Sequence, residues 1–208
     1  RTLQNFIQQL GTVALAIYIG LLIDPGRMML LFSYAKTLSF APVMLFGISI
    51  AQAAFPIMSR EKDRIDDFKQ TFISSFNQML YIILPVSAII LILRIPIVRL
   101  AYGAGAFDWD ATVLTGRILA LISISIFAQA LIELVNRAFY SLQDSKTPLV
   151  VSTITTAFLI ILTYMLIFDG GGMGIEGVAL AFTIKNILHL IIMFIILDIR
   201  VKGFDKQA

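Results

Sequence analysis

Six long apolar segments, separated by short polar ones, dominate the pattern of hydrophobic and polar residues. They run approximately over residues 6–23, 28–55, 71–93, 113–139, 148–168 and 174–197. A helix needs about 20 residues to cross the hydrocarbon core of a bilayer, and each segment is close to that length or longer. None alternates polar and apolar residues with a period of two, so helices are expected rather than the strands of a β-barrel. The pattern predicts an all-α integral membrane protein with six transmembrane helices.

Polar residues at the segment boundaries indicate where some of these helices begin. Asp108 or Thr112 is placed to cap the fourth helix. Thr147 is placed to cap the fifth, with Pro148 at its first helical position. Residues 96–102, between the third and fourth helices, are expected to form a short turn at the membrane interface.

The composition supports a membrane protein and excludes several other classes. The chain is 59% hydrophobic and 14% charged, with a mean hydropathy of +0.91, whereas soluble domains carry about 25% charged residues. The net charge of +3 is better explained by loops that contact anionic lipid than by nucleic acid. With no cysteine and a single histidine, His189, neither a disulfide framework nor a cysteine or multi-histidine metal site is expected, and no cofactor is predicted.

The distribution of basic residues predicts the orientation in the membrane. Ten of the 16 Lys and Arg residues fall on one side of the predicted helices: Arg1, Arg60, Lys62, Arg64, Lys69, Arg137, Lys146, Arg200, Lys202 and Lys206. Four fall on the other: Arg27, Arg94, Arg99 and Arg117. By the positive-inside rule, the first side and both termini are cytoplasmic, and the loops near Pro25, Gly105 and Gly171 lie outside. Because no initiator Met opens the chain, we expect an internal fragment of a longer protein.

Lys36 and Lys185 are charged residues inside predicted membrane segments. Counted from the outer helix ends, each lies roughly 12–14 Å deep, so the two ammonium groups are expected at one level. There they could bind a diphosphate in a water-filled cavity. The alternative is that each lysine extends to the interface or pairs with an acid, although positions 32, 33, 39 and 40 hold no acid that could pair with Lys36.

A second set of polar residues occurs on the fourth and sixth helices. Glu133 and Arg137 are spaced i,i+4, and Asn186 and His189 are spaced i,i+3, so each pair shares a helix face. Glu133 and His189 could meet and carry or sense a proton. Alternatively, the set is a fixed polar contact that holds helices together. The membrane segments contain no nucleophile with a base, no metal cluster and no paired carboxylates, so an enzyme with catalytic residues is not predicted.

Two loop motifs carry a resemblance to a known family. Residues 137–148 read R-A-F-Y-S-L-Q-D-S-K-T-P and include Tyr140, Asp144, Lys146, Thr147 and Pro148. Residues 103–108 read G-A-G-A-F-D and include Gly105, Phe107 and Asp108. With Tyr34, Pro42, Gly47 and Pro56, these motifs resemble the MurJ/MviN family of lipid II flippases, within the multidrug/oligosaccharidyl-lipid/polysaccharide exporter superfamily.

The resemblance implies that residues 1–208 are the C-terminal six-helix lobe of a two-lobe flippase in the bacterial cytoplasmic (inner) membrane. Such a protein moves undecaprenyl-diphosphate-linked disaccharide-pentapeptide across this membrane by alternating access, for peptidoglycan synthesis, cell-wall biogenesis and cell shape. The implied partners are this lipid-linked substrate, membrane lipids and the N-terminal lobe of the same protein.

One departure from the family keeps other functions open. Lys36-Thr37 stand where the family has Asp-Arg, and one residue turns a helix by about 100°. A flippase or exporter for another polyprenyl-linked oligosaccharide or a drug remains an alternative, as does a non-transporting scaffold lobe. The family's sodium site is not expected here, since its places near Leu15 and Leu159 are apolar and only Thr163 and Thr183 remain.

Overall fold

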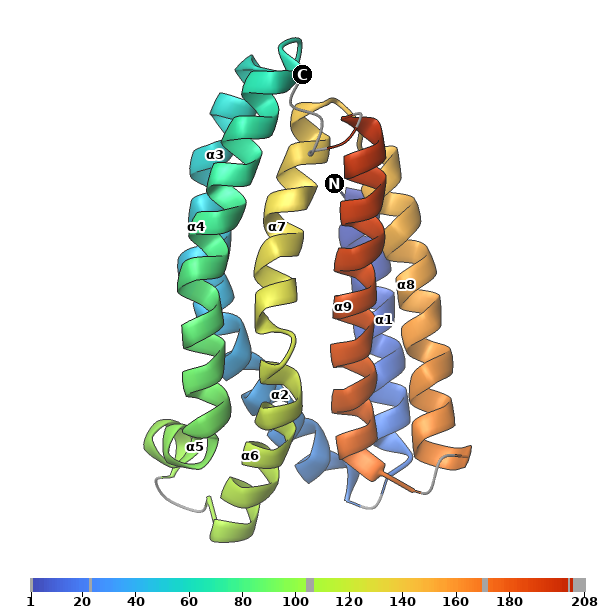
Figure 1. Ribbon diagram of the computed structural model, residues 1–208. Coiled ribbons are helices and arrows are strands. Elements are labelled where there is room, and N and C mark those ends of the chain that lie inside the picture. The colour runs from blue at the N-terminus through green and yellow to red at the C-terminus, as the bar shows by residue number, and fades with distance from the viewer. Residues whose placement is uncertain (1, 23, 104–106, 170–171, 202, 204–208) are drawn as a thin grey trace.

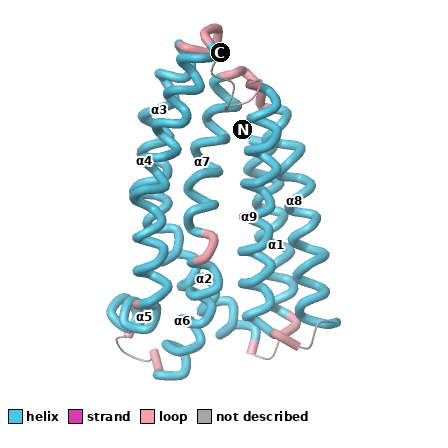
Figure 2. The backbone as a smooth tube through the Cα atoms, viewed as in Figure 1, coloured by secondary structure: helices cyan, strands magenta, loops and turns pink. Residues whose placement is uncertain are grey.

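The protein is a bundle of long helices standing side by side (Figure 1). The computed structural model describes residues 2–22, 24–103, 107–169, 172–201 and 203, and within these residues every regular element is a helix. Apart from one short break inside the bundle, the loops gather at its two ends (Figure 2). The predicted all-α class is confirmed.

The helices follow the six apolar segments, with changes at their boundaries. The first three elements are α1 (Thr2–Gly20), α2 (Pro25–Pro42) and a π-helix, η1 (Val43–Ile48), which runs directly into α3 (Ser49–Arg60). After these come α4 (Ile65–Ile92), α5 (Arg94–Tyr102), α6 (Trp109–Ser123) and α7 (Ile126–Ser141). The last are α8 (Lys146–Tyr164), which continues as a π-helix, η2 (Met165–Asp169), and α9 (Gly174–Arg200).

The predicted count of six membrane spans is not confirmed. Among the described residues, four helices are long and apolar enough to cross a membrane: Pro25–Arg60, Ile65–Ile92, Lys146–Phe168 and Gly174–Arg200. The bent pair formed by α6 and α7 makes up a fifth span if it is counted as one. Within α1, the apolar helix Gln9–Gly20 is shorter than a full span.

The prediction of one uninterrupted helix over residues 113–139 is wrong. The axis bends by 45° between α6 and α7, where the hydroxyls of Ser123 and Ser125 donate to backbone carbonyls three residues earlier, at 2.8 and 2.9 Å. Such hydroxyls compete with the helical backbone hydrogen bonds. At the break, the N–H of Ser125 donates to the carbonyl of Ile122 rather than to that of Leu121. The carbonyl of Leu121 accepts a hydrogen bond from Thr183 Oγ1 of α9, at 2.7 Å. The two serines and this contact from α9 account for a stable break inside the bundle.

The π-helix η1 follows Pro42, which lies inside an otherwise continuous helix. Proline has no N–H to donate and its ring crowds the carbonyl four residues earlier, so the helix widens locally. Gly47 lies in this segment, where an added Cβ would approach the Cβ of Ala130 in α7 to 2.9 Å. The glycine therefore permits η1 to pack closely against α7.

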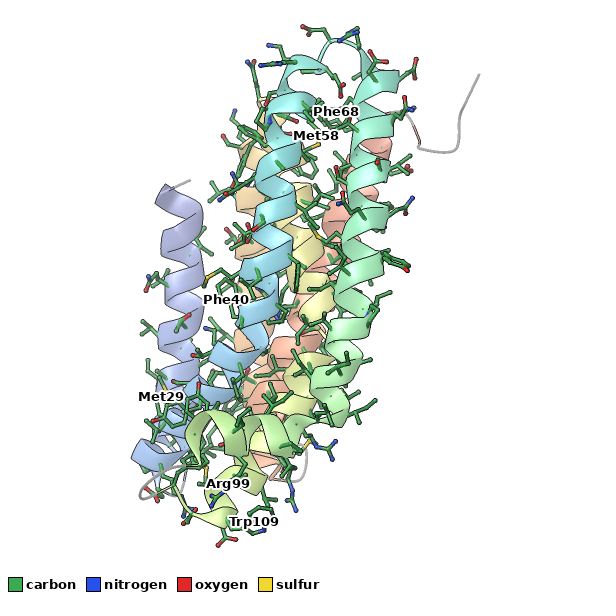
Figure 3. All side chains as sticks on the ribbon, turned by 90° about the vertical axis from the view of Figure 1, so that its left-hand side faces the viewer. Met29, Phe40, Met58, Phe68, Arg99 and Trp109 are labelled. Atoms are coloured by element: carbon green, nitrogen blue, oxygen red, sulfur yellow. The ribbon has the colours of Figure 1, made fainter. Side chains whose placement is uncertain are left out.

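Two apolar clusters fill the bundle. One joins α3, α4, α7 and α9 around Met58, Phe68 and Phe139, which are fully buried. Met58 and Phe68 lie where α3 meets α4 (Figure 3). The other cluster joins α1, α2, α6, α8 and α9 around residues such as Leu31 and Ile118. Helix α9 contributes residues to both clusters and packs against α7, so the two clusters are connected.

The predicted separation of loops between two ends agrees with the helix directions. The α3–α4 and α7–α8 turns lie at one end with the last turn of α9, and the α1–α2 connection lies at the other with α5 (Figure 1). Gly105 and Gly171 lie outside the described residues, as do Arg1, Lys202 and Lys206. Which end faces the cytoplasm stays a prediction.

Candidate functional site

A half-open cavity of about 330 Å³ lies between the helices of the bundle. It is lined from α1, α2, η1, α7, α8 and α9 by Gly11, Thr12, Leu15, Lys36, Phe40, Val43, Gln129, Ile132, Glu133, Thr156, Leu159, Phe182, Lys185, Asn186 and His189. The lining thus contains Lys36, Lys185, Glu133, Asn186 and His189, five residues that the sequence analysis singled out from three different segments.

Lys36 is held at the cavity by an aromatic ring. Its Nζ atom lies 5.7 Å from the centroid of the Phe182 ring, a distance at which the face of the ring attracts a cation. Phe182 in turn meets Phe32 edge to face, with centroids 6.4 Å apart. This packing orients the lysine toward α9 without neutralising its charge, so the ammonium group can still attract an anion.

Lys185 lies on α9 and lines the same cavity as Lys36. Its Nζ donates a hydrogen bond to Oδ1 of Asn186 at 3.3 Å. This contact is with a neutral amide, so it orients the ammonium group without itself neutralising the charge. The cavity therefore contains two cationic groups, one from α2 and one from α9.

His189 is fixed by a neighbour on α8. Its Nδ1 lies 2.9 Å from Oγ1 of Thr155, and that hydroxyl also donates to the carbonyl of Val151 at 2.8 Å. With the hydroxyl hydrogen used in this way, Nδ1 carries a proton and donates to Thr155, and Nε2 is the acceptor of the neutral ring. Among the described residues, neither Nε2 of His189 nor Nδ2 of Asn186 has a hydrogen-bond partner, and both are buried.

Arg137 does not join this group. It is absent from the cavity lining, and its guanidinium carbon lies 5.9 Å from the centroid of the Phe55 ring in α3. The i,i+4 spacing with Glu133 places both residues on one side of α7, but they contact different surroundings. Of the four predicted polar residues, the structure therefore brings together only Glu133, Asn186 and His189 around the cavity.

Several lining residues were missed by the sequence analysis. Gln129 precedes Glu133 by four residues and lies on the same face of α7, so its spacing was an available signal. Gly11 and Thr156 were not predictable in this way, because they line the cavity where α1 crosses α8. An added Cβ at Gly11 would approach Cγ2 of Thr156 to 2.9 Å, so the glycine permits this close approach.

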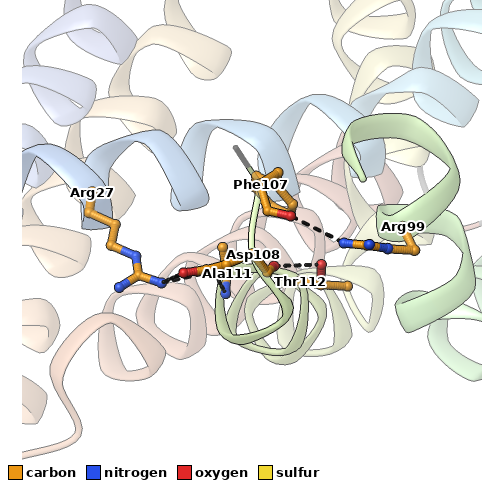
Figure 4. A network of polar contacts seen from close by, with 6 residues as sticks. All are labelled: Arg27, Arg99, Phe107, Asp108, Ala111 and Thr112. Carbon is orange, nitrogen blue, oxygen red and sulfur yellow. Dashed lines mark hydrogen bonds and ion pairs between the residues drawn. The ribbon is translucent and has the colours of Figure 1, made fainter. Parts of the chain in front are cut away.

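The motif of residues 103–108 connects α6 to α2 through Asp108 (Figure 4). Asp108 accepts a hydrogen bond from the backbone N–H of Ala111 at 2.7 Å, which confirms the predicted cap of α6. The same carboxylate contacts Arg27 of α2 at 3.1 Å. Arg99 donates to the carbonyl of Phe107 at 3.1 Å. Gly105, the remaining predicted residue of this loop, lies outside the described residues.

The motif loop within residues 137–148 joins α7, α8 and α9 at the opposite end of the bundle. Helix α8 begins at Lys146, and the carboxylate of Asp144 accepts hydrogen bonds from the backbone of Lys146 and Thr147, both at 3.1 Å. The prediction that Thr147 caps this helix is therefore wrong, because Asp144 already satisfies these donors and bonds the Thr147 hydroxyl at 2.8 Å. Pro148 is buried and follows Lys146 and Thr147 in the helix, so it does not take the predicted first position.

Asp144 also holds the end of α9. Its carboxylate lies 3.3 Å from Arg200, and its side chain is only 10% exposed. Burial alone would raise the pKa of Asp144, but the hydrogen bonds from Thr147 and the nearby Arg200 outweigh it and lower the pKa. The ionised carboxylate thus connects three helices.

The described residues contain no group of three or more His, Asp or Glu side chains arranged to hold a metal ion. Thr163 and Thr183 both donate to backbone carbonyls, of Leu159 and Leu121.

Comparison with known proteins identifies the family. The sequence profile described as lipid II flippase MurJ matches residues 2–208. The chain belongs to the lipid II flippase MurJ family. This confirms the resemblance found in the two motif loops.

Curated relatives of this MurJ-family chain are longer than it is. A probable lipid II flippase MurJ of Thermotoga maritima is 27% identical over 94% of this chain, which covers 39% of that relative. The lipid II flippase MurJ of Thermosipho africanus is 26% identical over 83% of the chain, which covers 35% of its length. The chain thus spans little more than a third of these relatives.

Solved structures share the fold. A lipid II flippase MurJ in an inward closed conformation matches with a TM-score of 0.82 at 22% identity, over 96% of this chain and 41% of that one. An inward-facing multidrug resistance MATE family transporter of the MOP superfamily matches with a TM-score of 0.78 at 14% identity, over 99% of this chain and 47% of that one. At these identities the likeness establishes the fold alone.

Proposed function

We propose that this chain is one lobe of a flippase that moves lipid II, the undecaprenyl-diphosphate-linked precursor of peptidoglycan, across the bacterial cytoplasmic membrane. Membership of the MurJ family supports this proposal. The observation that carries it is the cavity in which Lys36 and Lys185 occur together. The diphosphate of a cell-wall precursor is negatively charged, so cationic groups are needed to stabilise it where it passes from the lipid headgroups into the membrane interior.

In the proposed mechanism, the two lysines bind the diphosphate. Each lies within an apolar helix, where an uncompensated charge costs about 2.5–3.5 kcal/mol or more. An anionic ligand that enters the cavity offsets this cost, and the attraction is strong because the surroundings are weakly polarisable. Phe182 keeps Lys36 at the cavity surface through its ring.

The second lobe required for transport is proposed to precede this chain in the full-length protein. Alternating access needs two bundles that rock about a site between them, and relatives are more than twice as long as this chain. We propose that residues 1–208 form the C-terminal lobe, as the family resemblance of the motif loops implies, with an N-terminal lobe closing the cavity from the other side.

Lys36→Gln tests the proposed role of the cavity cations. In the full-length protein, reconstituted in vesicles, this variant should lower the rate of lipid II flipping by at least about tenfold. A tenfold loss corresponds to roughly 1.4 kcal/mol less stabilisation of the substrate's diphosphate as it crosses the membrane. Lys36→Arg should be milder because the charge survives. The matched control is Lys62→Gln in the charged α3–α4 turn, far from the cavity. Wild-type flipping by Lys36→Gln at equal abundance would reject the role of Lys36.

The orientation is also part of the proposal. The end that holds the α3–α4 and α7–α8 turns is assigned to the cytoplasm, because the sequence places ten Lys and Arg residues on that side of the helices and four on the other. In intact cells, Ser145→Cys should resist an impermeant thiol reagent, whereas Asp110→Cys at the start of α6 should react. Labelling in the reverse order would invert the assignment.

A second candidate function is transport of another polyprenyl-linked oligosaccharide or of a drug. The observation that favours it is Lys36-Thr37 in place of the family's Asp-Arg. Vesicle assays with polyprenyl diphosphates carrying different sugars would distinguish the candidates, since a lipid II flippase should prefer the disaccharide-pentapeptide. A non-transporting scaffold lobe would fail to restore growth to a strain depleted of its flippase.

A further inference from the structure

Helix α4 carries a row of polar side chains on the side that faces away from the bundle. Ser74, Asn77, Gln78 and Tyr81 are exposed, and Tyr81 is 84% exposed. Their spacing of i, i+3, i+4 and i+7 places them on one helix face. We call these four residues the polar stripe.

The buried side of α4 fixes this orientation. Phe68, Phe72, Met79 and Ile83 are at most 1% exposed and belong to the apolar cluster that α4 shares with α3, α7 and α9. Figure 3 shows Phe68 turned toward Met58 of α3. Rotating α4 to hide the polar stripe would expose these apolar side chains, so the stripe is fixed on the outside.

Lipid alone does not suit the polar stripe. Within the part of the chain that the structure describes, these four side chains make no hydrogen bond or ion pair. Ser74 lies about 7 Å and Tyr81 about 18 Å along the helix from Lys69, so the stripe extends into the hydrocarbon region. A polar group without a partner there is costly.

The outer face of α9 provides the contrast. Its exposed residues include Ile184, Ile191, Ile195 and Ile199, which need only lipid. Helix α9 has a length similar to that of α4 and also qualifies as a membrane span. The polar stripe is therefore not a general property of the outward faces in this bundle.

The chemistry of the polar stripe favours an identical partner. All four side chains are uncharged, and each carries both a hydrogen-bond donor and an acceptor. A row of such groups is complementary to a copy of itself. Two copies inserted with the same orientation and related by a twofold axis along the membrane normal would place α4 parallel to α4, with equal residues at equal depth.

The cavity leaves this face available. No residue of α4 is among those that line it, so the part of the protein that closes the cavity is needed on another side. We propose that the polar stripe of α4 is the seam of a homodimer, in which two copies pack α4 against α4. Asn77 and Gln78 would form the central carboxamide pairs.

Cysteine cross-linking of the full-length protein in membranes tests this seam. The chain itself has no cysteine, so only cysteines elsewhere in the protein must first be replaced. On oxidation, Asn77→Cys should give a disulfide-linked dimer as the main product, because equivalent Cβ atoms at the seam approach within disulfide reach. The matched control, Ile191→Cys on the outer face of α9, should stay monomeric.

The proposal would be overturned by no dimer from Asn77→Cys, by an adduct with a different protein, or by an equal yield from Ile191→Cys. A disulfide between Asn77→Cys and a cysteine placed in the other lobe of the same molecule, in place of the dimer, would also overturn it.

A second measurement does not depend on disulfide formation. The double variant Asn77→Leu, Gln78→Leu should weaken dimerisation by roughly fivefold to thirtyfold, the effect of an interhelical polar contact in a membrane. Energy transfer between labelled copies in vesicles, followed on dilution with lipid, measures the equilibrium. Ser75→Ala is the control, since that hydroxyl donates to Thr71 within its own helix. Unchanged dimerisation of the leucine variant would reject the seam.

Discussion

Helices α4 and α9 are alike in length and apolar character, yet they place their polar residues on opposite sides. Each is an apolar helix of 28 or 27 residues. In α9, Lys185, Asn186 and His189 face the cavity and isoleucines face outward. In α4, phenylalanines are buried and the polar stripe faces outward. The difference teaches that polar residues in a membrane helix indicate what that face contacts: the cavity for α9 and, in our proposal, a second copy for α4.

The inward polar groups of α9 are partly satisfied by their neighbours. His189 is fixed by Thr155, and Lys185 contacts Asn186, while the charge of the lysine remains available to a ligand. No such neighbour is seen for the outward groups of α4 within the described residues. The comparison therefore supports two proposals, that α9 takes part in substrate binding and that α4 associates with a second copy.

The largest effect is expected when a charge is placed on the apolar outer face of α9. Ile191→Lys should cost about 2.5–3.5 kcal/mol, the price of a lysine near the middle of a membrane helix. The membrane abundance of the full-length protein should fall accordingly. Ile199→Lys is the control, since near the helix end its amine can reach the interface. If both variants were as abundant as the wild type, the outer face of α9 would not be in contact with lipid.

Removing a cation from the inner face of α9 should affect transport rather than folding. Lys185→Leu should lower the rate of lipid II flipping by about tenfold or more, equivalent to roughly 1.4 kcal/mol, while abundance is maintained because a buried charge is removed. Gln78→Leu on α4 should leave the rate per molecule unchanged. Equal rates for wild type and Lys185→Leu in the same vesicles would contradict the assignment of α9 to substrate binding.

The attachment of the end of α9 should contribute a moderate, pH-dependent stability. Asp144→Asn should cost about 1 kcal/mol, because the ion pair with the half-exposed Arg200 is lost and a neutral amide is a weaker acceptor than a carboxylate for the backbone N–H groups of Lys146 and Thr147. The folded state lowers the pKa of Asp144, so its contribution is complete above the unfolded pKa of about 4 and is lost as the pH falls through the folded pKa.

Denaturation of the wild type and of Asp144→Asn at a series of acidic pH values would measure the difference in their stability. The control is Asp67→Asn at the start of α4, which breaks an exposed ion pair with Arg64 and should cost less than about 1 kcal/mol. A stability difference between wild type and Asp144→Asn that persisted at the lowest pH would contradict the role of the ionised carboxylate.

The smallest effect is expected for a single hydrogen bond on the inner side of α9. Thr155→Val removes the partner of His189 Nδ1 and should cost about 0.6 kcal/mol, the average for such contacts between membrane helices. Ser75→Ala on α4 removes only a bond within one helix and should have no measurable effect. Thermal unfolding in detergent compares the two. If Ser75→Ala lowered the unfolding temperature more than Thr155→Val, the expected order of the two contributions would be contradicted.

The sequence predicted part of the candidate site because some side chains are costly in any apolar helix. Lys36, Lys185, Glu133, Asn186 and His189 stood out as polar residues in long apolar segments, and all five line the cavity. Arg137 had the same signal and lies elsewhere, against Phe55. Helical spacing decides which residues share a face, but it does not decide what that face contacts.

The sequence by itself determined the helical membrane class, the family and the approximate helix limits, because these depend on local composition and on motifs such as that of residues 137–148. Only the tertiary structure decided the break at Ser123 and Ser125, where Thr183 of α9 satisfies a freed carbonyl. It also decided that Asp144 rather than Thr147 caps α8, and that the polar stripe of α4 faces outward. The physical reason is that a helix face acquires its meaning from the helices packed against it, and these contacts join residues far apart in the chain.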